Sequence, residues 1–469
     1  MTQKEKIKAY FDGIAEKRDQ WKKRNKQYHQ AIAHIVKFFV PPQSVVLDIG
    51  SSTGDLLHAV DARDGLGIDI SENMVAIAQH KYPQLHFQVM DAERISLDKK
   101  FDYILCANLP GYLTDVQVAF SEFKKVSHDH TKVFVAYYNY LWEPLLKLGE
   151  FLHLKMSSPI QNWLSQHDIE HMLSLAGFEM VRRGEEFLFP LRIPLITGFI
   201  NRFIAKLPLL RRLCLIKYVI AKPIQKQPHE YTVSVLIPAR NEKGNIENAI
   251  TRLPQLGKHT EIIFVEGGSK DGTPEEIQRV IKAYPEKDIQ YLAQKGNGKG
   301  DAVRTGFHVA QGDVLMILDA DLTVSPEDLP KFYDAIASGK GEFINGSRLV
   351  YQLEDEAMRP LNLLGNKFFG TMFSWILGQR LKDTLCGTKV LFKKDYEKIV
   401  ANRKFFGDFD PFGDFDLIFG ATKLGLKIID LPIRYKARTY GDTNISRWKH
   451  GWLLLQMTWF AMFKIKFIQ

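Results

Sequence analysis

Short apolar runs alternate with helix-length segments along most of the chain, in one series that starts at Ser44 and a second that starts at Thr232. The predicted strands are residues 44–50, 65–70, 86–90, 101–107 and 132–138, then 232–239, 261–267, 314–321 and 342–347. Such alternation is typical of parallel sheets with crossover helices. At 469 residues the chain is also too long for one ordinary core. We therefore predict an α/β protein with two domains, residues 1–225 and 230–469, joined by a polar, proline-broken stretch.

Two segments are rich in apolar and basic residues and lack acidic ones. In residues 187–222 the basic side chains are Arg192, Arg202, Lys206, Arg211, Arg212, Lys217 and Lys222. Residues 451–469 follow Arg447, Lys449 and His450 and carry two tryptophans. The uncharged runs are shorter than the roughly 20 residues that span a bilayer. Either these segments are helices packed on a domain with their basic residues in solvent, or they touch a membrane surface. We expect peripheral membrane contact and no transmembrane helix.

The net charge of +9 fits anionic partners but does not choose among them. The basic residues are interleaved with Leu, Ile and Phe and do not form a polar stripe, so a nucleic-acid partner is not expected. The three cysteines are widely scattered and the N-terminus lacks the apolar core of a signal peptide. These features predict a cytoplasmic protein that can lie on the inner face of a membrane.

Residues 45–57 read as a strand, a glycine turn and the start of a helix. Gly50 and Gly54 allow the backbone to turn tightly and to approach a ligand. The next strand ends on Asp69, 21 residues after Asp48, where a carboxylate can accept hydrogen bonds from two ribose hydroxyls. Asp91 follows the third strand, in reach of an adenine amino group. Asn108 and Tyr112 follow the fourth strand and should reach the same edge of the sheet.

With these motifs, residues 10–185 resemble a class I S-adenosylmethionine-dependent methyltransferase, which has a Rossmann-like fold. The final helix and strand of that family would be residues 163–181. The middle glycine of the family's turn is Ser52 here. The resemblance implies S-adenosylmethionine as cofactor, held by Asp48, Gly50, Gly54, Asp69, Asp91 and Asn108. The alternatives are an inactive domain that keeps the fold but has lost its cofactor, and a domain that only binds the cofactor as a scaffold.

Residues 10–30 have the pattern of an amphipathic helix and are expected to form a lid over the cofactor. Tyr28 and His29 in this segment could touch the methyl acceptor, although packing in the core is the more ordinary role for both. A sugar hydroxyl would need a general base such as histidine for methylation. The sequence does not single out one residue for this task.

The strand at residues 314–321 ends on two carboxylates, Asp319 and Asp321. Two carboxylates that point the same way repel each other unless a positive charge lies between them. Mg²⁺ or Mn²⁺ prefers carboxylate and phosphate oxygens together, so a divalent cation bound to a diphosphate explains the pair. The cation would stabilise a leaving nucleoside diphosphate. Glu266 at the end of an earlier strand can bind a base or ribose, and Lys299 lies in a glycine- and lysine-rich loop.

In the order of these motifs, residues 232–450 resemble the family 2 glycosyltransferases, which have a GT-A nucleotide-sugar fold. The branch most similar is that of the dolichyl-phosphate mannose synthases, although Glu266–Gly267 stands where that branch has an aspartate pair. The resemblance implies a UDP- or GDP-sugar donor and a polyprenyl phosphate or glycan acceptor. The implied donor contacts are Pro238, Arg240, Asn241, Glu242, Glu266, Lys299, Asp319, Arg438 and Arg447, with Lys449 as a further phosphate contact and with Asp319 and Asp321 as metal ligands.

The same family implies three further acidic residues near the acceptor. Asp383 and Lys389 belong to a D-T-x-C-G-x-K motif, and Asp414 and Asp416 begin a helix. If the acceptor is a hydroxyl, Asp416 is the predicted general base for an inverting attack. A lipid phosphate is already ionised and needs no strong base. Together the two halves predict a bifunctional enzyme of cell-surface glycan or glycolipid synthesis.

Overall fold

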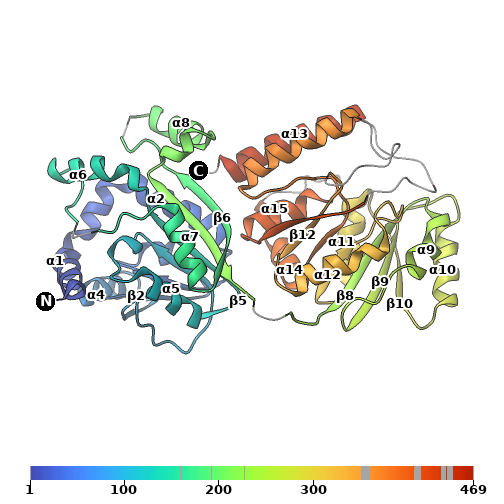
Figure 1. Cartoon of the computed structure of the whole chain (residues 1–469), viewed down its shortest axis with the longest axis horizontal. Coiled ribbons are helices and arrows are strands. Elements are labelled where there is room, and N and C mark those ends of the chain that lie inside the picture. Colours follow the sequence, from blue (N-terminus) through green and yellow to red (C-terminus); the bar gives the residue numbers. More distant parts are fainter. Residues whose placement is uncertain are drawn as a thin grey trace. The chain divides into compact units, whose positions relative to one another are not determined.

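The computed structural model describes residues 2–158, 161–191, 193–225, 228–349, 360–405, 413–434, 440 and 447–467, and at 360–364, 404 and 447–450 it describes the backbone alone. The described chain forms two compact units (Figure 1). One runs to Ile224 and includes Phe467, and the other is Gln225–Lys466. Each unit contains a seven-stranded sheet.

The sheet of the first unit has the strand order β3-β2-β1-β4-β5-β7-β6. Its strands are β1 (Val45–Ile49), β2 (Asp64–Asp69), β3 (His86–Val89), β4 (Phe101–Ala107), β5 (Ser127–Tyr138), β6 (Phe178–Glu186) and β7 (Ile216–Pro223). Strands β1 to β5 pair in parallel, whereas β7 runs antiparallel to both of its neighbours. The five predicted strands of this half are confirmed.

Helices accompany this sheet along the chain. They are α1 (Gln3–Arg24), α2 (Lys26–Phe39), α3 (Asp55–Ala59), α4 (Glu72–Lys81), α5 (Val116–Lys125), α6 (Glu143–Phe151), α7 (Gln166–Leu175) and α8 (Ile196–Arg202), with short 3₁₀ turns η1 (Pro110–Tyr112), η2 (Tyr140–Trp142), η3 (Ile204–Lys206) and η4 (Leu210–Leu213). The apolar sides of α5 and α7 bury Phe120, Phe123 and Leu173 in the core that also contains Leu47 and Ile104 of the strands. The alternation of apolar and polar residues thus places the core between the sheet and its helices.

A further strand follows the one that was predicted, within residues 163–181, as the last of this fold. Residues 216–223 form β7, which lies between β5 and β6 in the sheet. The sequence predicted that the basic residues of segment 187–222 lie either in solvent or at a membrane surface. Neither prediction holds for the two lysines at the end of the segment. Lys217 and Lys222 are buried and pair with Glu185 and Glu179 of β6, 3.7 and 3.1 Å away. Cross-strand glutamates therefore neutralise lysines that a linear pattern places in solvent.

The sheet of the second unit has the order β10-β9-β8-β11-β13-β12-β14. Its strands are β8 (Thr232–Ala239), β9 (His259–Glu266), β10 (Asp288–Ala293), β11 (Val314–Ile317), β12 (Phe343–Ser347), β13 (Lys389–Phe392) and β14 (Ile428–Pro432). Strands β8 to β11 pair in parallel, and β13 runs antiparallel to β11 and β12. The four predicted strands are confirmed, and β10, β13 and β14 were not predicted.

The helices of the second unit are α9 (Ile246–Thr251), α10 (Thr273–Ala283), α11 (Lys299–Val309), α12 (Leu329–Ala337), α13 (Pro360–Leu377), α14 (Lys393–Ala401), α15 (Phe415–Lys423) and α16 (Arg447–Ala461), with 3₁₀ turns η5 (Lys243–Asn245), η6 (Pro326–Asp328) and η7 (Arg403–Phe405) and the π-helical turn η8 (Met462–Lys466). Among the described residues, no helix is both long enough and apolar enough to cross a bilayer. Because β8, β9 and β11 are parallel, the loops after these strands meet at one edge of the sheet.

Candidate active sites

A cavity lies at the carboxyl ends of β1, β2 and β4 in the first unit. Four of the residues predicted to hold the cofactor line it: Gly50, Asp69, Asp91 and Asn108. Helix α1 supplies Lys4, Ile7, Phe11 and Arg18 to its other side. The predicted residues Asp48 and Gly54 do not line it. The topology therefore gathers at one place side chains that are far apart in the sequence.

The turn after β1 needs unusual backbone angles. Gly50 and Gly54 have φ values of 75° and 80°, and a Cβ at Gly54 would lie 2.7 Å from the Phe87 ring. Ser52, which replaces a glycine of the family pattern, also adopts a positive φ of 50°. Its backbone N–H donates to Asp69 Oδ2 at 2.8 Å, which helps to hold the turn in place. A serine is therefore accommodated here, at the conformational cost that a left-handed residue carries.

Asp69 receives a second hydrogen bond at Oδ1 from the Ser71 N–H, at 3.0 Å. Burial raises the pKa of Asp69 even though both amides favour its charged form. Asp48 lies deeper, with 2% of its surface exposed, and burial raises its pKa to about 7. The Oδ2 atom of Asp48 has no hydrogen-bond partner in the described part of the chain. Asp69 thus faces the cavity, while Asp48 is a buried acid beneath the turn.

Helix α1 is fastened to this edge of the sheet by polar contacts. Lys4 Nζ lies 2.7 Å from carboxylate oxygens of both Asp91 and Glu93. Further along the helix, the Ser71 hydroxyl donates to Asp12 at 2.6 Å. Helix α1 lines one side of this cavity, but the single helix predicted over residues 10–30 is wrong in extent, because α1 ends at Arg24 and α2 begins at Lys26.

The residues of this cavity fit S-adenosylmethionine. The glycine turn leaves no Cβ between the backbone and the cavity at Gly50, where an added Cβ would lie 3.1 Å from Leu109. Asp69 and Asp91 present carboxylate oxygens, which accept hydrogen bonds from hydroxyl and amino groups. Asp69 would hold the ribose of this cofactor and Asp91 its adenine. When bound, the cofactor supplies an electrophilic methyl group.

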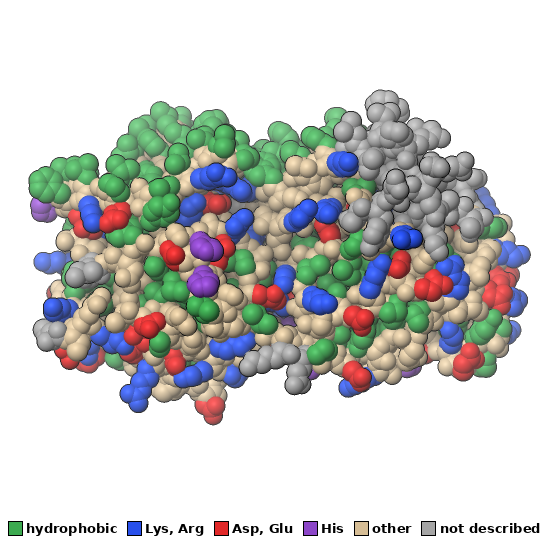
Figure 2. Space-filling view, viewed as in Figure 1, with side chains coloured by type: hydrophobic (Ala, Val, Ile, Leu, Met, Phe, Trp, Pro, Cys, Tyr) green, Lys and Arg blue, Asp and Glu red, His purple; other side chains and the backbone are tan. Residues whose placement is uncertain are grey.

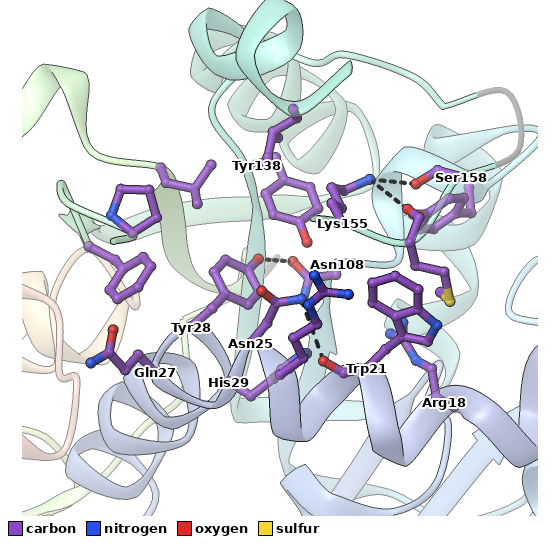
Figure 3. A pocket seen from close by; sticks show the side chains of 17 residues that line it. Arg18, Trp21, Asn25, Gln27, Tyr28, His29, Asn108, Tyr138, Lys155 and Ser158 are labelled. Carbon is purple, nitrogen blue, oxygen red and sulfur yellow. Dashed lines mark hydrogen bonds between the residues drawn. The ribbon is translucent and has the colours of Figure 1, made fainter. Parts of the chain in front are cut away.

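Tyr28 and His29 line a second cavity that adjoins the first (Figure 3). The Tyr28 hydroxyl donates to Asn108 Oδ1 at 2.5 Å, and only 6% of the Tyr28 surface is exposed. Burial lowers the pKa of His29 to about 3, with help from the nearby cations Arg18 and Lys22, so its imidazole is neutral at pH 7. The sequence singled out both residues and favoured packing in the core over contact with the substrate.

In the second unit, a lysine occupies the place next to the carboxylate pair. Lys299 Nζ lies 2.6 Å from Asp319 Oδ1. Burial opposes ionisation of Asp319, but the ammonium of Lys299 outweighs it and holds the pKa of Asp319 below its ordinary value. Asp321 Oδ1 instead accepts hydrogen bonds from the N–H and hydroxyl of Thr323, at 3.1 and 2.8 Å. The two aspartates therefore have different partners in this structure.

Two glycines permit the close approach of chain segments around Asp319. A Cβ at Gly387 would lie 1.8 Å from Asp319 Oδ2 and 2.4 Å from Lys299 Nζ. A Cβ at Gly413, whose φ is 74°, would lie 2.5 Å from Gly300 Cα. These contacts bring the loop before β13 and the start of α15 against the start of α11.

Asp414 and Lys389 complete this cluster of charges. Lys389 is fully buried, donates to the Cys386 carbonyl and lies 3.7 Å from Asp414 Oδ1. Asp414 is 4% exposed, and its Oδ1 has no hydrogen-bond partner among the residues described. The structure thus brings together Lys299, Asp319, Lys389 and Asp414, all of which the sequence predicted as site residues.

Two other predicted acids are held by arginines. Asp383 has no exposed surface, and its two oxygens accept from Arg348 at 2.7 and 2.8 Å. Asp416 Oδ2 accepts from Arg403 Nε at 2.9 Å, and Arg403 Nη2 lies 2.8 Å from the same oxygen as an ion pair. The sequence did not single out either arginine, because Arg348 lies 35 residues from its partner and Arg403 lies outside the recognised motifs. The catalytic roles of Asp383 and Asp416 stay predictions, and these ion pairs favour structural roles.

The loops after β8 and β9 contain the remaining predicted donor contacts. Asn241 joins the two loops, since its N–H donates to Ser269 Oγ and its Oδ1 accepts from the Lys270 N–H, each at 2.9 Å. Glu242 accepts from Asn245, and Glu266 accepts from the Ser269 N–H at 2.5 Å. Pro238 is partly exposed and Arg240 is exposed at the same edge.

Three predicted phosphate contacts cannot be placed. Arg438 lies outside the described residues, and the side chains of Arg447 and Lys449 are not described. Among the described residues there is no group of three or more His, Cys, Asp or Glu side chains arranged to hold a metal. The donor set still fits Mg²⁺ or Mn²⁺, because such ions often use one or two carboxylates together with phosphate oxygens. Asp319 and Asp321 would be those carboxylates.

Two family models match the chain. The model of a methyltransferase domain matches residues 21–183, and that of glycosyl transferase family 2 matches residues 234–400. The dolichol-phosphate mannosyltransferase of Pyrococcus furiosus is 41% identical over 221 residues, which are 46% of this chain and 59% of that relative. Glycosyltransferase AglJ of Haloferax volcanii is 27% identical over 230 residues, which are 48% of this chain and 71% of that relative.

A solved S-adenosylmethionine-dependent methyltransferase of Thermotoga maritima is 14% identical, with a TM-score of 0.38, and covers 46% of this chain and 99% of its own. The predicted fold class is confirmed: an N-terminal methyltransferase fold precedes a C-terminal GT-A-like fold, each with its own mixed sheet. Residues 21–183 therefore form a methyltransferase domain and residues 234–400 a family 2 glycosyl transferase domain, which makes the chain a two-domain transferase.

Proposed function

We propose that the second domain transfers a sugar from a UDP- or GDP-sugar to a polyprenyl phosphate, with inversion at the anomeric carbon, and that the first domain methylates a related glycan or glycolipid. The observation that carries the proposal is the cluster of Lys299, Asp319, Lys389 and Asp414 at the edge where β8, β9 and β11 end. A cluster of cations and carboxylates suits a diphosphate together with a metal ion. The likeness to a dolichol-phosphate mannosyltransferase supports a lipid phosphate as acceptor.

In this mechanism the chain's own residues position charge. Lys299 and Lys389 stabilise the negative charge that develops on the departing diphosphate. Asp319 and Asp321 would hold Mg²⁺ or Mn²⁺, which supplies further positive charge there. Asp414 is the carboxylate that remains available in this cluster, since its Oδ1 accepts no hydrogen bond in the described structure. We therefore assign to Asp414 the acceptor-side role, which is to position the acceptor beside the sugar. Asp383 and Asp416 instead position Arg348 and Arg403.

A membrane surface is the proposed place of this reaction. In the first domain, exposed apolar side chains gather over α6 and α8, and we call them the apolar rim (Figure 2). The apolar rim consists of Leu145, Leu148, Phe151, Leu191, Leu195, Phe199 and Leu209. Leu195 is 92% exposed and Leu209 is 78% exposed. Exposed apolar patches of this kind mark sites of protein or membrane contact, and the nearby exposed Arg212 favours anionic lipid.

The second domain offers a similar surface. Helices α13 and α16 pack together and expose Phe368, Trp452, Leu455 and Trp459. Tryptophan is enriched where apolar and aqueous regions of a membrane meet. A polyprenyl phosphate presents its phosphate at that level, so both domains would find their lipid-linked substrates without spanning the bilayer.

The test is a donor screen on the full chain with Mn²⁺ or Mg²⁺. Nucleoside diphosphate release is measured for each common UDP- and GDP-sugar, with and without a short polyprenyl phosphate. Release that requires both one donor and the lipid is the expected result. Release that ignores the lipid would move the acceptor to a glycan hydroxyl. If no donor is consumed while S-adenosylmethionine still binds, the proposed function of the second domain is wrong.

A separate test addresses the first domain. Transfer of label from methyl-labelled S-adenosylmethionine to lipid extract or to the glycosylated product would support a catalytic methyltransferase. Binding of the cofactor without transfer to any of these would instead assign the first domain the role of a scaffold.

A further inference from the structure

The second cavity of the first domain adjoins the cofactor cavity. Arg18, Asn108 and Tyr112 line both, so the two cavities meet at these side chains. The rest of the wall comes from the end of α1, the start of α2, β5, α6 and the segments around residues 155 and 187. A molecule in this second cavity would lie beside the cofactor.

The charged side chains of this wall are all cationic. Arg18, Arg24 and Lys155 line the cavity, and none of the lining residues is an aspartate or glutamate. Lys155 donates to Ser158 Oγ at 2.6 Å and pairs with Glu150, which lies outside the lining (Figure 3). A low-dielectric wall with one sign of charge attracts a ligand of the opposite sign. The cavity therefore favours an anionic group such as a phosphate.

Two buried polar atoms of this wall lack partners in the described structure, namely Arg18 Nε and Gln27 Oε1. A buried polar group without a hydrogen bond is destabilising, and a ligand that supplies the missing partner binds the more tightly for it. The guanidinium Nε donates, so it requires an acceptor such as a phosphate oxygen. The Gln27 carbonyl accepts, so it requires a donor such as a hydroxyl.

Aromatic rings form the remaining part of the wall. The rings of Tyr28 and Tyr138 are stacked with centroids 5.3 Å apart, and the Trp21 ring lies on the same cavity (Figure 3). The bond from the Tyr28 hydroxyl to Asn108 fixes one ring at the junction with the cofactor cavity. Fixed aromatic faces of this kind suit a ring-shaped ligand.

We propose that this second cavity binds the methyl acceptor and that the acceptor is a sugar that carries a phosphate. The assignment rests on the proposed methyltransferase function of the first domain. The cations and Arg18 Nε select the phosphate, Gln27 accepts from a sugar hydroxyl, and the rings of Trp21, Tyr28 and Tyr138 contact the sugar ring. The neutral imidazole of His29 lines the same cavity and offers one ring nitrogen as donor and the other as acceptor for a hydrogen bond. The phosphate could belong to a free sugar phosphate or to a lipid-linked one.

Calorimetry on the full chain tests the assignment. The chain is saturated with S-adenosylhomocysteine and titrated with a panel of hexose 1-phosphates, with the free hexoses, and with inorganic phosphate. We expect one hexose 1-phosphate to bind at least tenfold more tightly than its free hexose or phosphate alone. The Asp319→Asn chain should give the same result, because its altered residue lies in the other domain. A short prenyl ester of the same sugar phosphate separates the two sources: tighter binding indicates a lipid-linked acceptor, and equal binding a free one.

Variants of the wall make the test specific. Arg24→Gln and Gln27→Met should each weaken binding of the hexose 1-phosphate at least threefold and leave S-adenosylhomocysteine binding unchanged. Lys23→Gln is the matched control, because it removes a charge from the adjacent position of α1 outside the lining. Parental affinity in both wall variants, or equal affinity for free hexose, would overturn the assignment. Failure to bind S-adenosylhomocysteine would instead refute the methyltransferase function on which it rests.

Discussion

The ammonium of Lys299 lies 2.6 Å from the carboxylate of Asp319, at the edge where β11 ends. The positive charge that the sequence required beside its carboxylate pair is thus supplied in part by the protein itself. A divalent cation at Asp319 would share this carboxylate with Lys299 or displace it. On the proposed function, this contact would couple donor binding and metal binding to the stability of the domain.

Lys299→Met should reduce the free energy of unfolding of the second domain by about 2 kcal/mol in a metal-free buffer, because it leaves a largely buried carboxylate without its cation. Millimolar Mn²⁺ should restore part of that loss by binding to Asp319. The measurement is urea unfolding with and without Mn²⁺. Lys331→Met is the control, since it breaks a local i,i+3 pair with Asp328, and local pairs of this kind contribute about 0.5 kcal/mol or less. Equal stability of the Lys299→Met chain and its parent would contradict the prediction.

Asp414→Asn should mainly lower the rate of sugar transfer, whereas Asp416→Asn should mainly lower stability. Asp414 lies in the cluster with Lys389, so its loss should lower kcat for sugar transfer about 100-fold or more. Asp416 is paired with Arg403, so its loss should mainly reduce stability, by roughly 1–3 kcal/mol, and change kcat for a lipid phosphate by less than about threefold. Nucleoside diphosphate release per folded molecule and urea unfolding measure the two effects. The opposite pattern would assign the acceptor-side role to Asp416 and a structural role to Asp414.

Asp48→Asn should make the stability of the first domain less sensitive to pH. Burial raises the pKa of Asp48 to about 7, so the folded chain keeps this proton at pH values where the unfolded chain, with an ordinary pKa of about 3.9, has lost it. The stabilisation from this proton is complete below about pH 4 and is lost as the pH rises through 7. The variant has no carboxyl group at this position, so its stability does not fall through this deprotonation. Its stability relative to the parent should therefore rise by up to about 1.4 kcal/mol per pH unit between these limits.

The check is urea unfolding of both chains at pH 5, 6, 7 and 8, with the transition of the first domain identified by its shift in S-adenosylhomocysteine. Parallel pH profiles of variant and parent would show that Asp48 is not protonated in the folded state.

Leu195→Asp combined with Phe199→Asp should weaken binding to vesicles that contain anionic lipid by at least about tenfold, because burial of each large apolar side chain contributes about 1.5–3 kcal/mol. Co-sedimentation with vesicles of phosphatidylglycerol and phosphatidylcholine measures it. Leu175→Asp is the matched control, since Leu175 is 56% exposed on α7, outside the apolar rim. If the double variant and the Leu175→Asp control both bind the vesicles as tightly as the parent chain does, the apolar rim is not the membrane contact.

The sequence predicted the strands that carry the sites but not the strands that complete the sheets. β11 is a continuous apolar run and β1 is one that only Asp48 interrupts, so the burial of both strands follows from the pattern. β7 was not predicted because lysines such as Lys217 and Lys222 are usually exposed to solvent. Their burial depends on the glutamates of β6 that lie beside them. β13 was not predicted because Lys389 was interpreted as part of an acceptor motif. The structure shows that Lys389 is instead a fully buried strand residue. A pairing between distant strands leaves no local trace in the chain.

The same limit applies to the charges of the second site. Asp319, Asp414 and Lys299 could be named from motifs, since each lies at the end of a strand or at the start of a helix. The partners of Asp383 and Asp416 could not, because any of many arginines could have paired with them. Spatial pairing, which only the fold determines, separates the acids that are available to a substrate from those that hold the structure.

Strands β6 and β7 are antiparallel neighbours, with Glu186 opposite Ile216 and with the Leu215 N–H donating to the Phe187 carbonyl at 2.9 Å. Everything between them, including α8 and the apolar rim residues Leu195 and Phe199, is therefore the loop of one long hairpin. A hairpin loop can be exchanged without altering the ladder that flanks it. We expect a chain in which a short turn replaces residues 190–212 to keep the first domain's sheet and its cofactor cavity. The part of the proposed membrane contact that lies in this hairpin would thus be a separable module, which could be transplanted or varied while the fold of the domain stays the same.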